Sequence, residues 1–179
     1  MSLLDEISTA ARAVVTSVGP TVVTIGRTRR GAGIVVAAGR VVTNAHNLRD
    51  RTTQVAFSDG RVTQATVTGL DIDRDLAVLA VDTADASPIV WAEQPVQAGD
   101  VVFAAGPNNH GGRVTMGLVT TMGRAFRGPR GRRIEGSIEH SAPLARGSSG
   151  GPLVDRHGHL VGLNTHRLGD GFTLAVPAD

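Results

Sequence analysis

Short apolar runs rich in Val, Ile, Leu and Thr, bounded by Gly, Pro, Asn or Asp, constrain the fold of this 179-residue chain most. Runs of this length and composition are typical of β-strands. The first set comprises residues 21–26, 33–36, 41–45, 54–57, 62–67 and 76–81, and the second comprises residues 101–105, 114–122, 134–140, 153–155, 160–164 and 172–176. The two sets predict an all-β protein of two antiparallel six-stranded β-barrels, because barrel closure removes the edge strands that otherwise aggregate.

The residues before the first strand follow a helical pattern instead. Apolar side chains recur at helical spacing from Leu3 to Val18, and the pair Gly19-Pro20 ends the pattern. We therefore expect a short N-terminal helix over residues 1–20, an N-terminal barrel over residues 21–86 and a C-terminal barrel over residues 87–179. A chain of this length suits one domain or a tightly joined pair of lobes, so the barrels are expected to form a single unit.

Composition narrows the class of protein further. The chain has no Cys, which excludes a disulfide framework, and its formal charge is only +2, with Arg as its sole strong cation because Lys is absent. So small a charge gives weak support to nucleic-acid binding. No apolar run approaches the ~20 residues that span a bilayer, and Asp5 and Glu6 interrupt the start of the chain in a way that does not fit a signal peptide.

Three segments carry residues suited to nucleophilic chemistry. His46 ends an apolar hairpin in the sequence V-V-T-N-A-H, Asp75 ends the run D-I-D-R-D before an apolar strand, and Ser149 lies in the glycine-dense stretch R-G-S-S-G-G-P. A Ser nucleophile needs a base within hydrogen-bond reach, and that base needs a carboxylate to orient it. The three segments supply one group of each kind. Asp71 and Asp73 are rivals to Asp75, which the position directly before the strand favours.

The order of these residues separates two architectures. The order His, Asp, Ser belongs to chymotrypsin-like proteases, whereas subtilisins run Asp, His, Ser. Residues 147–151 also satisfy the G-x-S-x-G elbow of α/β-hydrolases. That elbow leads from a strand into a helix, and its Asp and His follow the Ser, whereas Pro152 here leads into a strand. The hydrolase elbow is therefore rejected.

Taken together, the segments resemble the HtrA/Deg branch of the trypsin-like serine proteases. The matching motifs are G-A-G-I-V-V and V-T-N-A-H, then D-L-A-V-L, T-M-G-L-V, G-S-S-G-G-P-L and G-L-N-T, and the similarity extends over nearly the whole chain. Two features depart from the family pattern. Ser148 replaces the usual Asn before the nucleophile, and residues 140–146 lack the usual Asp-Ala.

The resemblance implies a catalytic triad of His46, Asp75 and Ser149, with an oxyanion hole formed by Gly147, Ser148 and Ser149. Ser149 would attack the scissile carbonyl, His46 would transfer the proton, and Asp75 would orient the imidazole. The N–H groups of Gly147 and Ser149 would bind the oxyanion. This chemistry uses water and implies no cofactor and no metal.

The resemblance also implies how a substrate is held. A strand edge that pairs with the substrate main chain would accept many sequences, and the residues that correspond to it are Leu163, Asn164, Thr165 and His166. The residue six positions before the nucleophile, Pro143, would form the base of the specificity pocket, with Leu144 beside it and Arg146 at the lip. We expect small or medium apolar side chains before the cut, unless a protonated His166 attracts an acidic one.

The same resemblance implies partners and a location. The expected substrates are unfolded or misfolded polypeptides, as in protein quality control, and no nucleic-acid partner is expected. Relatives continue into a PDZ domain, which this chain does not contain; such a domain or a membrane anchor would lie outside it. A monomer and a trimer both remain open, and relatives commonly act outside the cytoplasm.

Three alternatives remain to be compared with the structure. The protein could be a peptide-binding chaperone or resting protease with a collapsed oxyanion turn. A nucleic-acid-binding module could use the basic loop of Arg124, Arg127, Arg130, Arg132 and Arg133, although Phe126 is the single aromatic residue among them and one ring makes a poor platform for base stacking. His157 and His159 could form a metal pair, but they lack further ligands at suitable spacing, which favours a polar turn.

Overall fold

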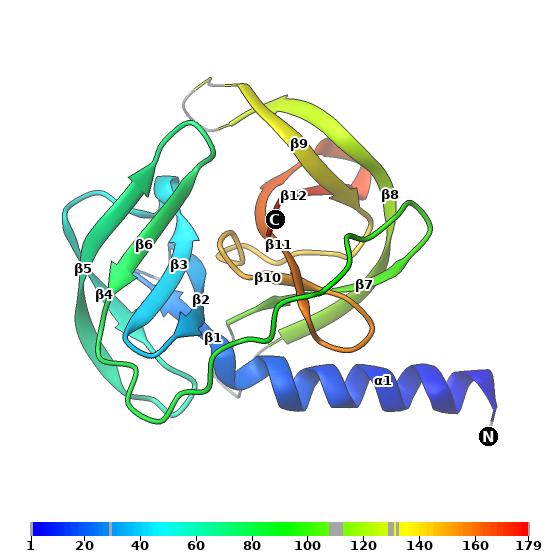
Figure 1. The fold of residues 1–179 in the computed structure, drawn as a ribbon, viewed down its shortest axis with the longest axis horizontal. Helices are drawn as coiled ribbons and strands as arrows, with labels where there is room; N and C mark the ends of the chain where they lie inside the picture. Colours follow the sequence, from blue (N-terminus) through cyan, green and yellow to red (C-terminus); the bar gives the residue numbers. More distant parts are fainter. Residues whose placement is uncertain (1, 29, 108–112, 129–130, 132, 179) are drawn as a thin grey trace.

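The computed structural model describes residues 2–28, 30–107, 113–128, 131 and 133–178. Within these residues the chain forms one α-helix, α1 (Leu3–Val18), and twelve strands in two closed barrels (Figure 1). The first barrel contains β1 (Val22–Ile25), β2 (Gly31–Ala37), β3 (Arg40–Asn44), β4 (Thr52–Ala56), β5 (Val62–Asp71) and β6 (Leu76–Ala80). The second contains β7 (Val101–Gly106), β8 (Arg113–Arg127), β9 (Arg133–His140), β10 (Pro152–Val154), β11 (Leu160–Arg167) and β12 (Thr173–Pro177). The predicted fold class is confirmed.

Both barrels have the same strand order and the same mode of closure. The first runs β1-β2-β3-β6-β5-β4, and the second runs β10-β11-β12-β9-β8-β7. All neighbouring strands are antiparallel, and each barrel closes through a short pairing, β1 with β4 and β10 with β7. Closure leaves neither sheet with a long unpaired edge. Unpaired edge strands promote aggregation, which is why the sequence analysis expected closed barrels.

Alternation along the strands directs one set of side chains into each barrel. In β6, Ala77 and Leu79 are buried while their neighbours are partly exposed, the period of two expected of a strand with one buried face.

The hairpin between β4 and β5 turns at Asp59 and Gly60. Gly60 has a φ of +88°, a left-handed conformation that glycine adopts without steric cost.

Helix α1 packs against the second barrel and helps to join the two lobes. Ser2 caps the helix through a reciprocal pair of hydrogen bonds with Asp5. At the other end Val14 and Val18 are buried in a cluster with residues of both barrels, which we call the shared core. Its members are Val14, Val18, Val22, Ala32, Ile34, Ile89, Phe103, Ala105, Val154, Leu160 and Leu163. In the described part of the chain, no helix has the length and apolar character to span a membrane.

Candidate active site

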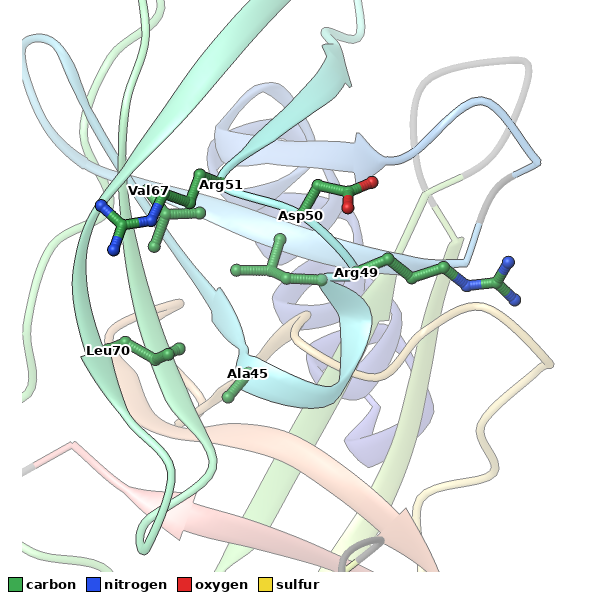
Figure 2. A pocket seen from close by; sticks show the side chains of 7 residues that line it. Ala45, Arg49, Asp50, Arg51, Val67 and Leu70 are labelled. Carbon is green, nitrogen blue, oxygen red and sulfur yellow. The ribbon is translucent and has the colours of Figure 1, made fainter.

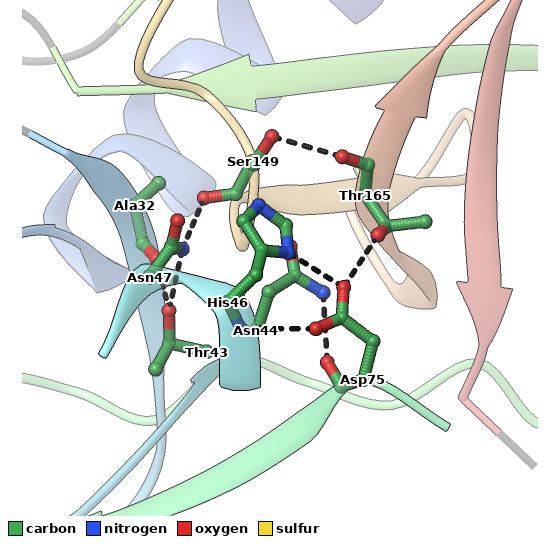
Figure 3. Close-up of polar contacts among 8 residues, drawn as sticks. All are labelled: Ala32, Thr43, Asn44, His46, Asn47, Asp75, Ser149 and Thr165. Carbon is green, nitrogen blue, oxygen red and sulfur yellow. Dashed lines mark hydrogen bonds and ion pairs between the residues drawn. The ribbon is translucent and has the colours of Figure 1, made fainter. Parts of the chain in front are cut away.

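His46 lies directly after β3, in the 3-10 turn η2 (Ala45–Asn47), with its ring facing Asp75 (Figure 3). Nδ1 of the ring lies 2.7 Å from Oδ2 of Asp75, and the backbone N–H of His46 donates to Oδ1 at 3.0 Å. Because a carboxylate only accepts, Nδ1 carries the proton and Nε2 is the basic nitrogen of the neutral ring. Nε2 has no hydrogen-bond partner among the described residues, so it is available to take up a proton.

Asp75 is buried, and its backbone is fixed to the end of β3. Its φ of +58° is left-handed, a conformation that Asp adopts more readily than most residues. Its carbonyl accepts hydrogen bonds from the N–H of Ala45 at 3.0 Å and from the side-chain amide of Asn44 at 3.1 Å. These contacts hold the carboxylate next to the turn that carries His46.

The two rival acids have other environments. The carboxylate of Asp71 accepts the N–H groups of Asp73 and Arg74 at 3.0 Å each and so caps its own turn. Asp73 is exposed. Of the three acids that the sequence suggested, Asp75 is the one that faces His46.

Thr165, in β11 of the second barrel, links the acid to the serine. Its hydroxyl donates to Oδ2 of Asp75 at 2.9 Å, and its carbonyl accepts the hydroxyl of Ser149 at 2.9 Å (Figure 3). Sequence reasoning gave Thr165 a role in substrate pairing and did not identify the contact with Asp75. The motif G-L-N-T drew attention to Thr165. Its contact with Asp75 joins positions 90 residues apart, so no local motif could predict that contact.

Ser149 lies in a turn that is anchored to the first barrel. Its carbonyl accepts the N–H of Ala32 at 2.7 Å and the side-chain amide of Asn47 at 2.8 Å. Its hydroxyl points to Thr165 and makes no hydrogen bond with His46. Transfer of the Ser149 proton to Nε2 therefore requires the hydroxyl to turn away from Thr165 by rotation about χ1.

The turn before Ser149 has an open arrangement of donors. Gly147 has a φ of +83°, and the N–H of Ser148 donates to the carbonyl of Ala145 at 3.3 Å. A turn with positive φ at its third residue has the character of type II and requires glycine there. The N–H groups of Gly147 and Ser149 donate to no group in the described residues, whereas the N–H of Ser148 is already used. Two free donors on one turn can bind an oxyanion if both point to the same place.

A small pocket of about 50 Å³ adjoins Ser149. Of the residues that the sequence placed in substrate binding, four line it: Leu144, Arg146, Thr165 and His166. Arg167, which the sequence analysis did not select, lines it too. Pro143 is exposed, does not line this pocket, and accepts the hydroxyl of Thr115 through its carbonyl at 2.6 Å. The structure therefore does not bring Pro143 to the base of the pocket.

Leu163 and Asn164 are buried rather than presented at a strand edge. The N–H and carbonyl of Asn164 are bonded to Gly151 and Gly150, at 2.9 and 2.7 Å. Its side-chain amide donates to the carbonyls of Gly151 and Pro152. Asn164 thus supports the chain behind Ser149, and the stretch left to pair with a substrate is Thr165 to Arg167.

His140 is a buried partner of Asn164 that the sequence analysis did not select. Its Nε2 lies 2.9 Å from Oδ1 of Asn164, and its Nδ1 has no hydrogen-bond partner. Since the amide nitrogen of Asn164 donates elsewhere, Oδ1 accepts, and Nε2 of His140 carries the proton. Burial lowers the pKa of His140 to about 4, against the smaller opposing effect of its hydrogen bond to Asn164.

The described members of the basic loop have partners within their own hairpin. Arg124 pairs with the buried Glu139, Arg133 donates to Glu135, and Arg127 donates to the carbonyl of Gly131. Arg130 and Arg132 lie outside the described residues. These contacts favour a structural role for the loop over nucleic-acid binding.

Two further features lie outside the site. The rings of His157 and His159 are 5.8 Å apart, but no group of three metal-ligating side chains occurs among the described residues. A hollow of about 390 Å³ on the first barrel includes Arg49, Asp50 and Arg51 in its lining (Figure 2). None of the site residues predicted from the sequence lines it.

Comparison with known proteins places the chain in a family. Residues 31–163 match the model of the trypsin-like peptidase domain. Protease Do-like 5, chloroplastic, of Arabidopsis thaliana is 32% identical over 79% of this chain and 51% of its own length. Serine endoprotease DegS of Escherichia coli K12 is 36% identical over 75% of this chain and 39% of its own length. The chain thus spans about half or less of the length of these curated relatives.

Solved structures give the same result. The HtrA-type protease AlgW with a tripeptide aligns with a TM-score of 0.82 and 32% identity, over 94% of this chain and 60% of AlgW. The Rv3671c protease in an inactive form aligns with a TM-score of 0.79 and 27% identity, over 92% of this chain and 87% of that one. With its two barrels and its sequence similarity over most of its length, the chain belongs to the trypsin-like peptidases, as a member of the HtrA/Deg family.

Proposed function

We propose that this chain is a serine endopeptidase domain whose triad is His46, Asp75 and Ser149. The observation that carries the proposal is the convergence of three segments distant in sequence. A buried carboxylate orients a His, the basic nitrogen of that His is unpaired, and a Ser lies beside two free backbone donors. The combination provides a base, an orienting acid, a nucleophile and an oxyanion site, which is what acyl transfer requires.

The reaction follows from these positions. Ser149 rotates from Thr165 toward Nε2 of His46, gives up its proton and attacks the scissile carbonyl carbon. The oxyanion forms opposite the N–H groups of Gly147 and Ser149, where one such donor is typically worth about 3–4 kcal/mol. The imidazolium, stabilised by Asp75, then protonates the leaving amine. Water attacks the acyl-enzyme by the same route, with His46 again as the base.

The second hypothesis, a resting enzyme with a collapsed oxyanion turn, receives less support. A collapsed turn would direct the carbonyl of Arg146 toward the site and hide the N–H of Gly147. The positive φ of Gly147 and its free N–H favour the open form. The hydrogen bond from Ser149 to Thr165 is compatible with the open form, because rotation about χ1 releases the hydroxyl from it.

The proposed substrates are unfolded or misfolded polypeptides, bound through main-chain pairing along Thr165 to Arg167. The pocket beside Leu144 has about 50 Å³ of room, and one water needs roughly 10–15 Å³ on the same measure, so the pocket fits a side chain of a few heavy atoms. We propose Ala or Val before the cut, and a site of action outside the cytoplasm, as for relatives of this family.

A fluorophosphonate probe tests the nucleophile. It should label Ser149, because the probe reacts only with a serine that an adjacent base activates. His46→Ala should abolish labelling and casein cleavage together, and Ser149→Ala is the control for labelling elsewhere. Labelling of a different Ser, or casein cleavage without labelling, would contradict the assignment.

A further inference from the structure

A larger hollow of about 680 Å³ lies between the two barrels, beside the same turn that precedes Ser149. On one side it is lined by β1 and β4 of the first barrel and the loops that follow them, including Thr24, Arg27 and Gln54. On the other side it is lined by Pro107 and Arg113 at the ends of β7 and β8, and by residues 145–147. We call this hollow the interbarrel cleft.

The interbarrel cleft and the small pocket share one wall. Residues 145–147 line both, and they carry the Gly147 donor of the proposed oxyanion site. In the proposed function, the substrate residues before the scissile bond lie along Thr165 to Arg167, on the pocket side of this turn. A polypeptide that crosses Ser149 in an extended form therefore leaves on the other side of the turn. Its residues after the scissile bond enter the interbarrel cleft.

Among the described residues that line the cleft, every charged one is a cation. These residues are Arg27, Arg113 and Arg146, and all three side chains are exposed. None of them has a hydrogen-bond or ion-pair partner among the described residues. The neighbouring acid, Asp59, pairs instead with Arg61 at 3.6 Å. Three unpaired cations around a concave surface raise the local concentration of anionic groups.

We propose that the interbarrel cleft binds the leaving-group side of the substrate and selects Asp or Glu in the first few positions after the scissile bond. The inference rests on the proposed endopeptidase function and adds a substrate class to it. Guanidinium groups bind carboxylates through two parallel hydrogen bonds, which fits side chains of an extended acidic peptide. Nucleic acid fits less well, because the lining aromatic, Phe57, is buried and Arg61 covers its ring at 4.0 Å.

The test uses two internally quenched peptides that share Val before the cut. One carries Glu at the second, third and fourth positions after it, and the other carries Gln at the same positions. We expect kcat/KM for the Glu peptide to be about tenfold higher at low salt, because exposed charge pairs contribute modestly and additively here. The preference should shrink toward equality in about 0.5 M NaCl, where screening is strong. The acyl-enzyme is identical for both peptides, so deacylation cannot produce the difference.

Variants assign the preference to the cleft. Arg27→Gln combined with Arg113→Gln should lower the Glu-to-Gln ratio to about twofold, because only Arg146 of the three cations remains. Arg156→Gln, an exposed arginine in the turn between β10 and β11, removes one charge elsewhere and should keep the ratio. An aminocoumarin peptide has no residues after the cut, so its cleavage does not depend on the interbarrel cleft. The rate on this peptide therefore measures any damage to the reaction centre in each variant, and the other rates are divided by it. Arg27→Glu with Arg113→Glu should reverse the preference toward a Lys peptide, which misfolding cannot do.

The outcomes separate the two proposals. Equal cleavage of both peptides by the unmodified protein would overturn the acidic preference and leave the endopeptidase standing. An undiminished ratio in the double variant would also overturn it. If neither peptide is cleaved and Ser149 is not labelled by the fluorophosphonate, the endopeptidase function fails and the inference fails with it.

Discussion

At the scale of single residues, Asp75 is held by more contacts than the sequence motif alone suggested. Its carboxylate accepts from Nδ1 and from the N–H of His46 and from the hydroxyl of Thr165. The Thr165 hydroxyl keeps Oδ2 aimed at the ring, so Thr165 acts on the proposed triad as a positioning residue.

Thr165→Val should therefore slow the reaction while leaving the fold intact. The substitution removes one hydrogen bond to a charged group, for which about 1.5–3 kcal/mol is typical, so kcat should fall roughly ten- to hundredfold. KM should change little, since the Thr165 hydroxyl contacts Asp75 and substrate pairing uses the main chain. Thr165→Ser is the matched control and should restore kcat. An unchanged kcat in Thr165→Val, or a loss that appears only in KM, would contradict the positioning role.

The second residue-scale prediction concerns His140. Its pKa is about 4 in the folded protein against an ordinary value of 6.5. Between these pH values the unfolded chain binds more protons than the folded one, so stability falls as the pH drops from 6.5 to 4. The full effect is roughly 3 kcal/mol.

Urea unfolding at pH 7.5 and pH 4.5 measures this loss. His140→Gln, whose amide can still donate to Asn164, should lose less stability over the interval than the unmodified protein. The exposed His157→Gln should behave like the unmodified protein. Equal losses in all three proteins would show that His140 does not sense the pH.

At the scale of elements, local patterns sufficed to locate all twelve strands. The predicted cores agree with the structure, but β5, β8 and β11 extend beyond the predicted residues 62–67, 114–122 and 160–164. The additional residues include polar and charged side chains, such as Asp71, Arg127 and Arg167, and their ladder partners place them in strands despite low β-propensity. Pairing partners are distant in sequence and leave no local signal.

In the candidate site, too, the residues in contiguous motifs were predicted from the sequence and the contacts between distant residues were not. His46, Asp75 and Ser149 follow from motif and order, because each motif is contiguous. The contacts of Thr165 with Asp75 and of His140 with Asn164 arise only when the barrels close, and no periodicity encodes them. Pro143 was placed in the pocket by counting back from Ser149, which ignores the path of the loop between β9 and β10.

Helix α1 gives an element-scale prediction. Val18 is 1% exposed in the shared core, whereas Val15, about one turn earlier in the helix, is 43% exposed. Val18→Ala should lower the free energy of unfolding by about 1–2 kcal/mol, since it removes buried methyl groups and leaves a cavity. Val15→Ala should change it by less than about 0.5 kcal/mol. Chemical denaturation of both variants measures the difference, and similar values would mean that α1 adds little to the shared core.

At the scale of the whole molecule, the proposed triad depends on how the barrels are joined. His46 and Asp75 belong to the first barrel and Ser149 to the second. Hydrogen bonds from Ala32 and Asn47 to Ser149, and from Thr165 to Asp75, cross between them. The shared core adds apolar contacts between the barrels, since it includes Ile34 from one barrel and Phe103 from the other. We therefore expect the barrels to unfold as one cooperative unit.

Leu79→Ala tests this expectation, because Leu79 is fully buried in a cluster made of first-barrel residues and the segments that flank them. Removing a buried Leu side chain costs about 2–5 kcal/mol. If the barrels unfold together, this cost lowers the protection of every amide that exchanges by global unfolding, including those of β11 and β12 in the second barrel. Native-state hydrogen exchange should then show protection there falling about thirtyfold or more, as in β3 and β6. Leu3→Ala, at a position 71% exposed, is the control and should leave protection unchanged. Loss of protection confined to β1 through β6 would mean that the first barrel opens alone, and that the contacts across the site do not couple the two lobes.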